Sequence, residues 1–224
     1  MLATFDLLYK NAWLYWLAST IPFAGQWRTW QRLVLPRLQG HDILEVGCGP
    51  GWLLGDMIAA GYRCMAIDAS PQMVATTRRT LRRHGIADAQ AIVQQARAQS
   101  LPFTTASFDC VVSTFPAPYI SDVATLHEIA RVLRPGGRLI IVEGASLQPR
   151  GPILRLLVAI ERIVYGSAVV EGPPDVAQRE ALARRIPLAE AGMTVAQDVV
   201  SGPFWYAYIC IGTKDPDVHS YEEQ

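Results

Sequence analysis

Several features that would assign this chain of 224 residues to other protein classes are missing from it. Twenty basic residues balance twenty acidic ones, so no overall field attracts nucleic acid or an anionic membrane, and only a local patch would do so. The four cysteines (48, 64, 110 and 210) have neither metal-ligand spacing nor a C-x-x-C pair. We therefore expect no metal site, and reduced thiols in the core of a cytoplasmic protein.

Long apolar runs are also missing. Residues 12–25 are apolar, but the stretch is short, contains Pro22 and lacks the basic start of a signal peptide. Residues 153–164 are interrupted by Arg155, Glu161 and Arg162, well short of the roughly 20 apolar residues that a membrane span requires. We expect neither a signal peptide nor a transmembrane segment.

The run 43–51 (ILEVGCGPG) is the most informative feature that is present. An apolar strand ends there in Glu45 and in glycines at positions 47, 49 and 51. Glycine permits positive φ and has no Cβ, so a nucleoside can approach the backbone closely. Asp68 ends a second apolar run 21 residues after Gly47, the spacing expected for a carboxylate that binds ribose hydroxyls. The two features predict a nucleoside-cofactor site.

Two other nucleotide sites fit poorly. A dinucleotide turn needs a third glycine where this chain has Trp52, which disfavours a NAD-dependent oxidoreductase. A P-loop ends in Gly-Lys-Ser/Thr, which is absent here.

The run instead resembles the first motif of class I S-adenosylmethionine (SAM)-dependent methyltransferases. The similarity extends over residues 42–143, and the matching segments after Asp68 are 101–103 (LPF), 107–112 (SFDCVV) and 128–137 (EIARVLRPGG). These segments are similar to the branch that contains ubiquinone and menaquinone methyltransferases, phospholipid N-methyltransferases and many small-molecule enzymes. The resemblance is specific for fold and cofactor and weak for the substrate.

The resemblance also implies roles for particular residues. Glu45 would lie near the amino group of SAM, Asp68 would accept both ribose hydroxyls, and Ala69 and Met73 would flank the adenine. The alternatives are a core role for Met73 and a helix-stabilising charge for Glu45. The full set of implied cofactor contacts is Glu45, Gly47, Cys48, Gly49, Gly51, Asp68, Ala69, Met73, Arg97, Ala98 and Ser113.

One departure from the family pattern falls before residues 101–103. This branch typically has Gly-Asp-Ala there, and the aspartate accepts from the adenine amino group, whereas this chain has Ala96-Arg97-Ala98. Arginine cannot accept that hydrogen bond, although Arg97 can stack on the adenine and the Ala98 N–H can pair with it. We expect moderate SAM affinity.

The predicted reaction is an in-line methyl transfer from SAM, which becomes S-adenosylhomocysteine (SAH), to a small apolar acceptor such as a quinone, a lipid head group or a secondary metabolite. Positioning dominates such a reaction, so a base is needed only for some acceptors. No catalytic residue is assigned; the base candidates are Tyr9, Tyr15, Tyr119 and Asp122, whereas His41 and His127 fit surface positions. The alternative is a scaffold protein with this fold and no transferase activity.

Nucleic acid is not an expected partner. Residues 113–119 (STFPAPY) resemble the Asn/Asp-Pro-Pro-Tyr/Phe motif of amino methyltransferases, but they lack its first residue and its adjacent prolines. Contact of the apolar helices with a membrane surface is a hypothesis, and the sequence does not determine the oligomeric state.

The pattern of elements predicts an α/β fold, namely a Rossmann-like, doubly wound, seven-stranded and mostly parallel sheet whose last strand is antiparallel. We expect strands at 42–46, 63–68, 91–95, 108–113, 138–143, 194–200 and 205–212. We expect helices at 5–17, 27–38 with a break near Pro36, 52–60, 70–84, 122–133, 152–165 and 176–185. The arginines that end the 70–84 helix complement its negative C-terminal end.

The expected organisation is a single domain over residues 1–214. Residues 1–40 would form a helical lid, residues 144–187 a variable insert that caps the substrate, and residues 215–224 a flexible tail. Four of the six tryptophans lie in the first 30 residues. They are candidates for a wall of the acceptor pocket, or they pack the leading helices onto the sheet.

Overall fold

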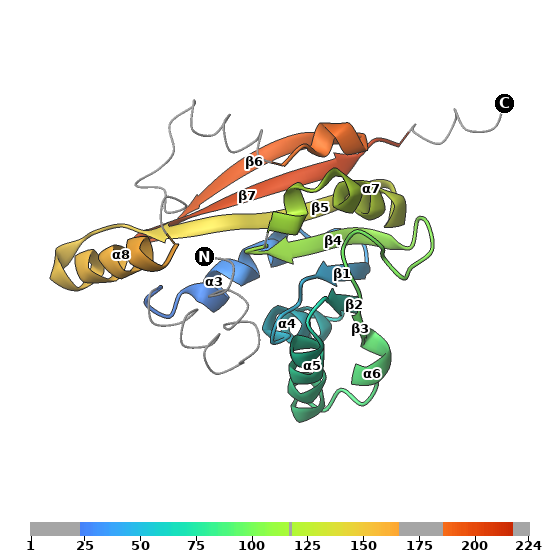
Figure 1. The fold of residues 1–224 in the computed structure, drawn as a ribbon, viewed down its shortest axis with the longest axis horizontal. Helices are drawn as coiled ribbons and strands as arrows, with labels where there is room; N and C mark the ends of the chain where they lie inside the picture. Colours follow the sequence, from blue (N-terminus) through green and yellow to red (C-terminus); the bar gives the residue numbers. More distant parts are fainter. Residues whose placement is uncertain (1–22, 117, 166–185, 217–224) are drawn as a thin grey trace.

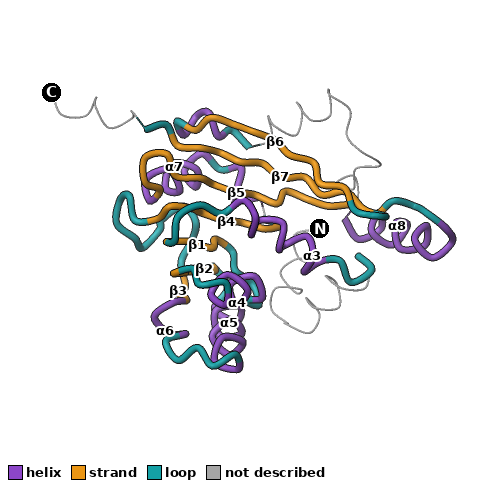
Figure 2. Tube along the Cα trace, turned by 180° about the vertical axis from the view of Figure 1, so that it is seen from behind, coloured by secondary structure: helices purple, strands orange, loops and turns teal. Residues whose placement is uncertain are grey.

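The computed structural model describes residues 23–116, 118–165 and 186–216, and the side chains of all of these except 160–165. The described chain forms a seven-stranded sheet in the order β3-β2-β1-β4-β5-β7-β6 (Figures 1 and 2). Strands β1 to β5 are parallel where they pair, and β7 is antiparallel to both of its neighbours. The predicted fold class is therefore confirmed. The strands are β1 Asp42–Val46, β2 Arg63–Asp68, β3 Val93–Gln95, β4 Phe108–Thr114, β5 Leu133–Leu147, β6 Met193–Ser201 and β7 Trp205–Lys214.

Short helices connect the strands. The α-helices are α3 Trp27–Gln31, α4 Trp52–Ala59, α5 Pro71–Arg83, α6 Ala89–Ile92, α7 Val123–Val132 and α8 Gly151–Tyr165. The 3-10 helices are η1 Arg32–Arg37, η2 Pro118–Ser121 and η4 Leu188–Ala191. Helix α5 begins as its sequence predicts, because Ser70 caps it by accepting from the Met73 N–H and Pro71 occupies its first turn.

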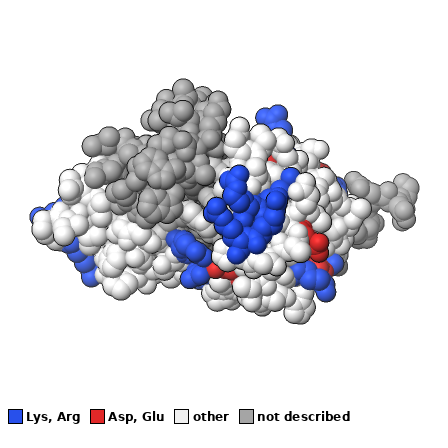
Figure 3. Space-filling model, turned by 90° about the horizontal axis from the view of Figure 1, so that it is seen from below, with Lys and Arg blue, Asp and Glu red and all other residues white. Residues whose placement is uncertain are grey.

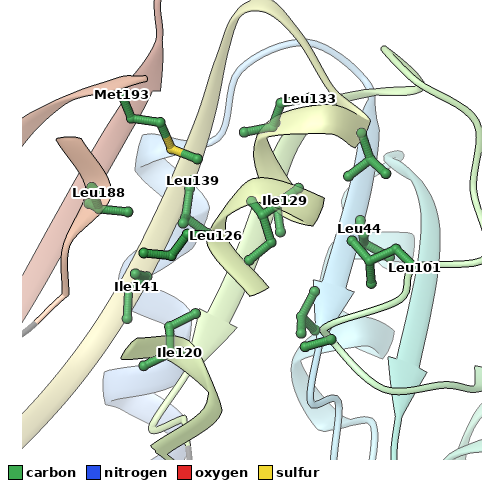
Figure 4. Close-up of a cluster of buried hydrophobic side chains, with 14 of the residues drawn as sticks. Leu44, Leu101, Ile120, Leu126, Ile129, Leu133, Leu139, Ile141, Leu188 and Met193 are labelled. Atoms are coloured by element: carbon green, nitrogen blue, oxygen red, sulfur yellow. The ribbon is translucent and has the colours of Figure 1, made fainter. Parts of the chain in front are cut away.

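The alternation of side chains along the central strands divides the core between the two faces of the sheet. On one face, Leu44 and Val111 pack with Leu126 and Ile129 of α7 (Figure 4). On the other face, Ile43 and its neighbours pack with residues of α4 and α5. Glu45 projects to this second face by the same alternation, next to the helices that follow the glycine-rich turn.

A third buried cluster, which we call the aromatic cluster, lies beyond the carboxyl end of β4. Its described members include Phe23, Trp27, Trp30, Phe115 and Trp205. The Trp27 and Phe115 rings stack with centroids 4.1 Å apart, and the Trp30 and Trp205 rings meet edge to face at 6.1 Å. Trp27 and Trp30 therefore pack α3 onto the sheet. That the same side chains also form a wall of the acceptor pocket stays a prediction. Trp13 and Trp16 lie outside the described residues, as do the predicted helices at 5–17 and 176–185.

Several boundaries differ from the prediction. Strand β5 continues to Leu147 because β7 pairs with it as far as Trp205, so the first four residues of the predicted insert belong to the sheet. Strand β7 extends to Lys214, whose buried ammonium donates to the carbonyls of Ala130 and Leu133. Strand β3 begins at Val93, because residues 89–92 form helix α6 instead of a strand. The predicted helix at 27–38 divides at Gln31 into α3 and the 3-10 helix η1.

An ion-pair network joins the amino-terminal ends of the central strands. Asp42 accepts from Arg63 and Arg134, and Asp109 accepts from Arg134 and from the backbone N–H of His41 and Asp42. The hydrogen bond from Arg63, together with Arg134, lowers the pKa of Asp42 to about 2. Asp109 and Arg134, which belong to the matching sequence segments, therefore lie at the amino-terminal ends of the strands, opposite the glycine-rich turn.

Candidate cofactor site

The glycine-rich turn follows β1 and leads into α4. Gly47, Gly49 and Gly51 all have positive φ (76°, 51° and 79°), a conformation that side chains with a Cβ rarely adopt. A Cβ at Gly51 would also overlap the side chain of Thr77 on α5. The Gly47 and Cys48 N–H groups donate to the Ile67 carbonyl, which brings the turn against the end of β2.

Asp68 lies beside this turn, as the spacing predicts. Its Oδ2 accepts from the Gly49 N–H and its Oδ1 from the Ser70 N–H, each at 2.9 Å. Burial raises the pKa of Asp68, and these two hydrogen bonds oppose the increase. Each carboxylate oxygen keeps a second lone pair, so the held carboxylate can still accept two ribose hydroxyls.

Glu45 is the most perturbed carboxylate of the site. Its side chain is 1% exposed, and its Oε2 has no hydrogen-bond partner among the described residues. Burial, with smaller contributions from the charges of Asp68 and Asp56, raises the pKa of Glu45 to about 8. A buried acceptor without a partner is costly, and a ligand ammonium group would satisfy it.

Thr77 on α5 supports the glycine-rich turn. The Thr77 hydroxyl lies within hydrogen-bond distance of the Gly49 and Met73 carbonyls and 3.6 Å from the Cys48 sulfur. Thr77 was not among the predicted site residues, because a threonine inside a helix has no distinguishing sequence signal. Met73 is buried in α5 whereas Ala69 is exposed, so their predicted contact with adenine stays a prediction.

The loop after β3 holds the other two predicted adenine contacts. The Ala96 N–H donates to the Asp68 carbonyl, which brings this loop to the site. The Arg97 side chain is exposed and Ala98 is buried in the core. Glu128 accepts from the Leu101 N–H, and Arg131 donates to the carbonyls of Leu101 and Phe103. This pair on α7 therefore holds the loop in place.

Ser113 and Tyr119 lie at the carboxyl ends of β1 and β4. The buried Ser113 hydroxyl donates to the Val46 carbonyl at 2.9 Å, so it already has a partner within the protein. The Tyr119 hydroxyl lies 3.0 Å from Ser113 Oγ and 3.1 Å from the Val46 carbonyl oxygen. A Cβ at Gly47 would lie 2.5 Å from this hydroxyl. Of the two base candidates that lie among the described residues, Tyr119 is therefore the one that the structure brings to the turn.

Asp122, the other base candidate among the described residues, is occupied elsewhere, and the two histidines lie away from the turn. Asp122 caps α7 by accepting from the Ala124 N–H and also accepts from Gln99. The exposed His127 ring contacts the Glu190 carbonyl. His41 directly precedes β1, at the end of the strand away from the glycine-rich turn. Tyr9 and Tyr15 lie outside the described residues.

Helix α3 places aromatic side chains next to the site. Asp56 on α4 accepts from both Arg28 and Arg32, which ties α3 and η1 to the helix that follows the turn. Phe115 directly follows β4 and has a φ of 49°, a strained backbone conformation for an aromatic residue. The Gln31 amide donates to Thr114, the last residue of β4. The carboxyl end of β4 is thus bordered by an apolar wall with a polar pair at its edge.

The four cysteines are buried thiols with raised pKa values, and the predicted cofactor contact of Cys48 stays a prediction. Burial raises the pKa of Cys64, Cys110 and Cys210 to about 12, and that of Cys48 well above its usual value. All four are therefore protonated core thiols at neutral pH.

Comparison with known proteins identifies the family of the central part of the chain. Residues 43–137 match the model of a family described as a methyltransferase domain. Residues 43–137 are therefore a methyltransferase domain, and this part of the chain is similar to the class I SAM-dependent methyltransferases. It is 32% identical over 147 residues to the ubiquinone/menaquinone biosynthesis C-methyltransferase of Hahella chejuensis, covering 62% of this chain and 58% of that protein. It is 34% identical over 110 residues to a malonyl-[acyl-carrier protein] O-methyltransferase of Erwinia billingiae, covering 46% and 39%. The chain thus spans about half the length of these relatives.

A solved structure supports the fold. Geranyl diphosphate C-methyltransferase of Streptomyces coelicolor, crystallised with Mg²⁺, geranyl diphosphate and SAH, superposes with a TM-score of 0.57. The match covers 84% of this chain and 79% of that one at 14% identity, which shows a shared fold alone.

The match to a methyltransferase domain implies SAM as the cofactor, and the described residues fit it. Three of the five residues of the turn are glycines without a Cβ, and Asp68 is held beside the turn with free lone pairs. Glu45 has a buried oxygen that lacks a hydrogen-bond partner among the described residues. These are the groups that the ribose hydroxyls and the amino group of SAM require. Arg97 is the exception, because its exposed guanidinium offers no acceptor to adenine.

Proposed function

We propose that this protein transfers the methyl group of SAM to a small, largely apolar acceptor such as a quinone, a lipid head group or a secondary metabolite. The observation that carries the proposal is the pair of carboxylates at the glycine-rich turn, the buried Glu45 and the partly buried Asp68. Their elevated pKa values suit them to a cationic, hydroxyl-bearing ligand. When bound, SAM supplies an electrophilic methyl group on a sulfonium. The residues of this chain bind it, orient the acceptor and exclude water.

The acceptor class rests on the aromatic cluster. Phe115 and Trp27 form a stacked pair at the carboxyl end of β4, and most ligand sites in proteins are apolar with a few placed polar groups. Gln31 and Thr114 supply such a polar pair. The name of one curated relative, a ubiquinone/menaquinone biosynthesis C-methyltransferase, supports a quinone among these acceptors. The name of another, a malonyl-[acyl-carrier protein] O-methyltransferase, indicates that acceptors differ among the relatives.

Tyr119 is the residue we propose for acceptors that must lose a proton. Its hydroxyl lies at the turn, next to Gly47. A tyrosine hydroxyl can relay a proton from an unionised hydroxyl or an acidic carbon, whereas a neutral amine needs no base. Tyr119→Phe would separate these cases, because only transfer to the first two kinds of acceptor would slow.

The deciding experiment is calorimetric titration of SAM and SAH into the purified chain, with Asp68→Ala as the control. Micromolar binding that the substitution abolishes, followed by SAH release with a panel of lipophilic acceptors, is the expected result. A scaffold protein without transferase activity is the alternative, motivated by Arg97. Absence of binding would favour it, and binding without turnover on any acceptor would leave a cofactor-binding scaffold.

A further inference from the structure

Helix α8 has two apolar faces, and only one of them is packed. Leu154, Leu157 and Val158 contact the aromatic cluster. On the other side, Ile153 and Leu156 are 74% and 63% exposed. Successive helical residues are turned by about 100°, so these two side chains project only about 60° apart and form one surface.

This exposure is unusual within the described part of the chain. Val195 on β6, at 42%, is the only other large hydrophobic side chain that is comparably exposed there. An isolated exposed residue needs no explanation, but neighbouring exposed hydrophobic residues commonly mark a binding surface. The unpacked face of α8 is therefore the candidate interaction surface.

The charge around this face indicates what binds it. Arg150 and Arg155 are both exposed. Residues 150–165 contain three arginines and one glutamate, a net charge of +2 in a chain whose overall charge is zero. Basic atoms are also visible in Figure 3 at the end of the molecule that α8 occupies in Figure 1. An apolar surface flanked by cations is complementary to anionic lipid.

The dimensions of α8 suit a helix that lies on a membrane. Its 15 residues extend about 22 Å, less than the roughly 30 Å of a hydrocarbon core. Among the described residues, no helix is long and apolar enough to cross a membrane. Helix α8 also projects past the end of the sheet in both ribbon views, where a flat surface can reach it (Figures 1 and 2).

We propose that α8 binds the surface of an anionic lipid bilayer, with Ile153 and Leu156 inserted among the acyl chains and Arg155 beside the phosphate groups. The packed face of α8 shares the aromatic cluster with Phe115, which directly follows β4. A bilayer bound to α8 therefore lies on the acceptor side of the candidate site. Membrane binding itself does not depend on methyl transfer.

Vesicle flotation tests this proposal with the full chain. We expect it to float with vesicles of phosphatidylcholine and phosphatidylglycerol, to be released by high salt, and to float weakly with phosphatidylcholine alone. The double variant Ile153→Ser/Leu156→Ser should lower the partition coefficient at least about tenfold, since each side chain loses its apolar insertion. Arg155→Gln should lower it about fivefold.

Two matched controls separate α8 from general effects. Val195→Ser makes the same polar change at an exposed site on β6 and should leave flotation unchanged. Arg82→Gln/Arg83→Gln removes exposed arginines from the end of α5, part of the described chain remote from α8, and should also have no effect. All substituted side chains are exposed, so the melting temperature of each variant should match the parent.

Three results would overturn the proposal. They are absence of flotation with anionic vesicles, equal losses in the α8 variant and in either control, and a dimer in light scattering that the α8 double variant converts to a monomer. The last result would identify a second copy of the chain as the occupant. Because SAH binding is measured separately by calorimetry, a failure of the proposed function is distinguishable from a failure of membrane binding.

Discussion

Acidification should weaken SAH binding strongly through Glu45. The pKa of about 8 means that this carboxyl is neutral in most free molecules at neutral pH. A ligand ammonium favours the ionised form, and the ionised fraction falls from about 24% at pH 7.5 to about 0.3% at pH 5.5. The ammonium keeps its charge throughout this range. We therefore expect SAH affinity to fall about 80-fold, equivalent to about 2.6 kcal/mol, on moving from pH 7.5 to pH 5.5.

Calorimetry at several pH values measures this effect. Each bound SAH should release close to one proton at pH 6.5, which titrations in buffers of different ionisation enthalpy can count. Glu45→Gln keeps the shape of the side chain without its charge, so its SAH affinity should be weaker at pH 7.5 and nearly independent of pH. Methylthioadenosine, which lacks the amino-acid part of SAH, serves as the matched ligand.

Methylthioadenosine also separates the contribution of Asp68 to the pH dependence from that of Glu45. Its pKa is raised as well, so some loss of affinity at the acidic end is expected from the ribose contact. That loss should appear equally for SAH and methylthioadenosine, whereas the Glu45 effect should appear for SAH alone. Equal pH dependence for both ligands, or the same slope in Glu45→Gln, would refute the assignment of Glu45 to the amino group.

Three further predictions concern stability. Glu45→Gln should raise the melting temperature of the ligand-free protein at pH 8. The pKa of Glu45 is raised from 4.5 in the unfolded chain to about 8 in the folded protein, so its stabilising contribution is present below pH 4.5 and is lost as the pH rises through about 8. A gain in melting temperature that does not shrink toward pH 5 would contradict this. Asp42→Asn should lower the free energy of unfolding in urea by about 1–2 kcal/mol at pH 7. The pKa of Asp42 is lowered from 3.8 to about 2, so its contribution is present above 3.8 and lost as pH falls through 2, and a deficit that persists below pH 2 would argue against the network. Gly51→Ala should lower the free energy of unfolding by about 2 kcal/mol or more and weaken SAH binding, because φ is 79° and the new Cβ overlaps Thr77. Its matched control is Gly55→Ala in α4, where a Cβ meets nothing within 4 Å, and this variant should stabilise the protein by about 0.5–1 kcal/mol. Similar effects of the two glycine substitutions would count against the steric argument.

Local sequence predicted the elements whose signals are strong. Strands β1 and β2 have the predicted bounds, because each is a short apolar run between turn residues. Helix α5 begins at its predicted Ser70-Pro71 start. Strands β5 and β7 were predicted too short, because pairing with other strands decides where they end. Residues 144–147 of β5 pair with β7, Leu133 pairs with Phe108 of β4, and Lys214 of β7 pairs with Met193 of β6.

Part of the candidate site was also predictable from local sequence. Glu45, the glycines and Asp68 stand at the ends of strands, so their positions follow from the βαβ pattern and its handedness. Thr77 and Phe115 could not be found this way. Thr77 supports the turn from the middle of α5, and Phe115 takes an unusual φ at the end of β4, and neither has a local sequence signature.

The sequence alone determined the fold class, the glycine-rich turn and the carboxylate at the end of β2, because local periodicity, spacing and the conformational freedom of glycine specify them. Tertiary structure decided the rest. It left Glu45 buried without a partner, which raises its pKa, gave Ser113 a partner within the protein, and brought Tyr119 to the turn. It also divided the apolar residues of α8 between a packed face and an exposed one. These properties depend on which distant residues surround a side chain, and spacing along the chain does not encode that.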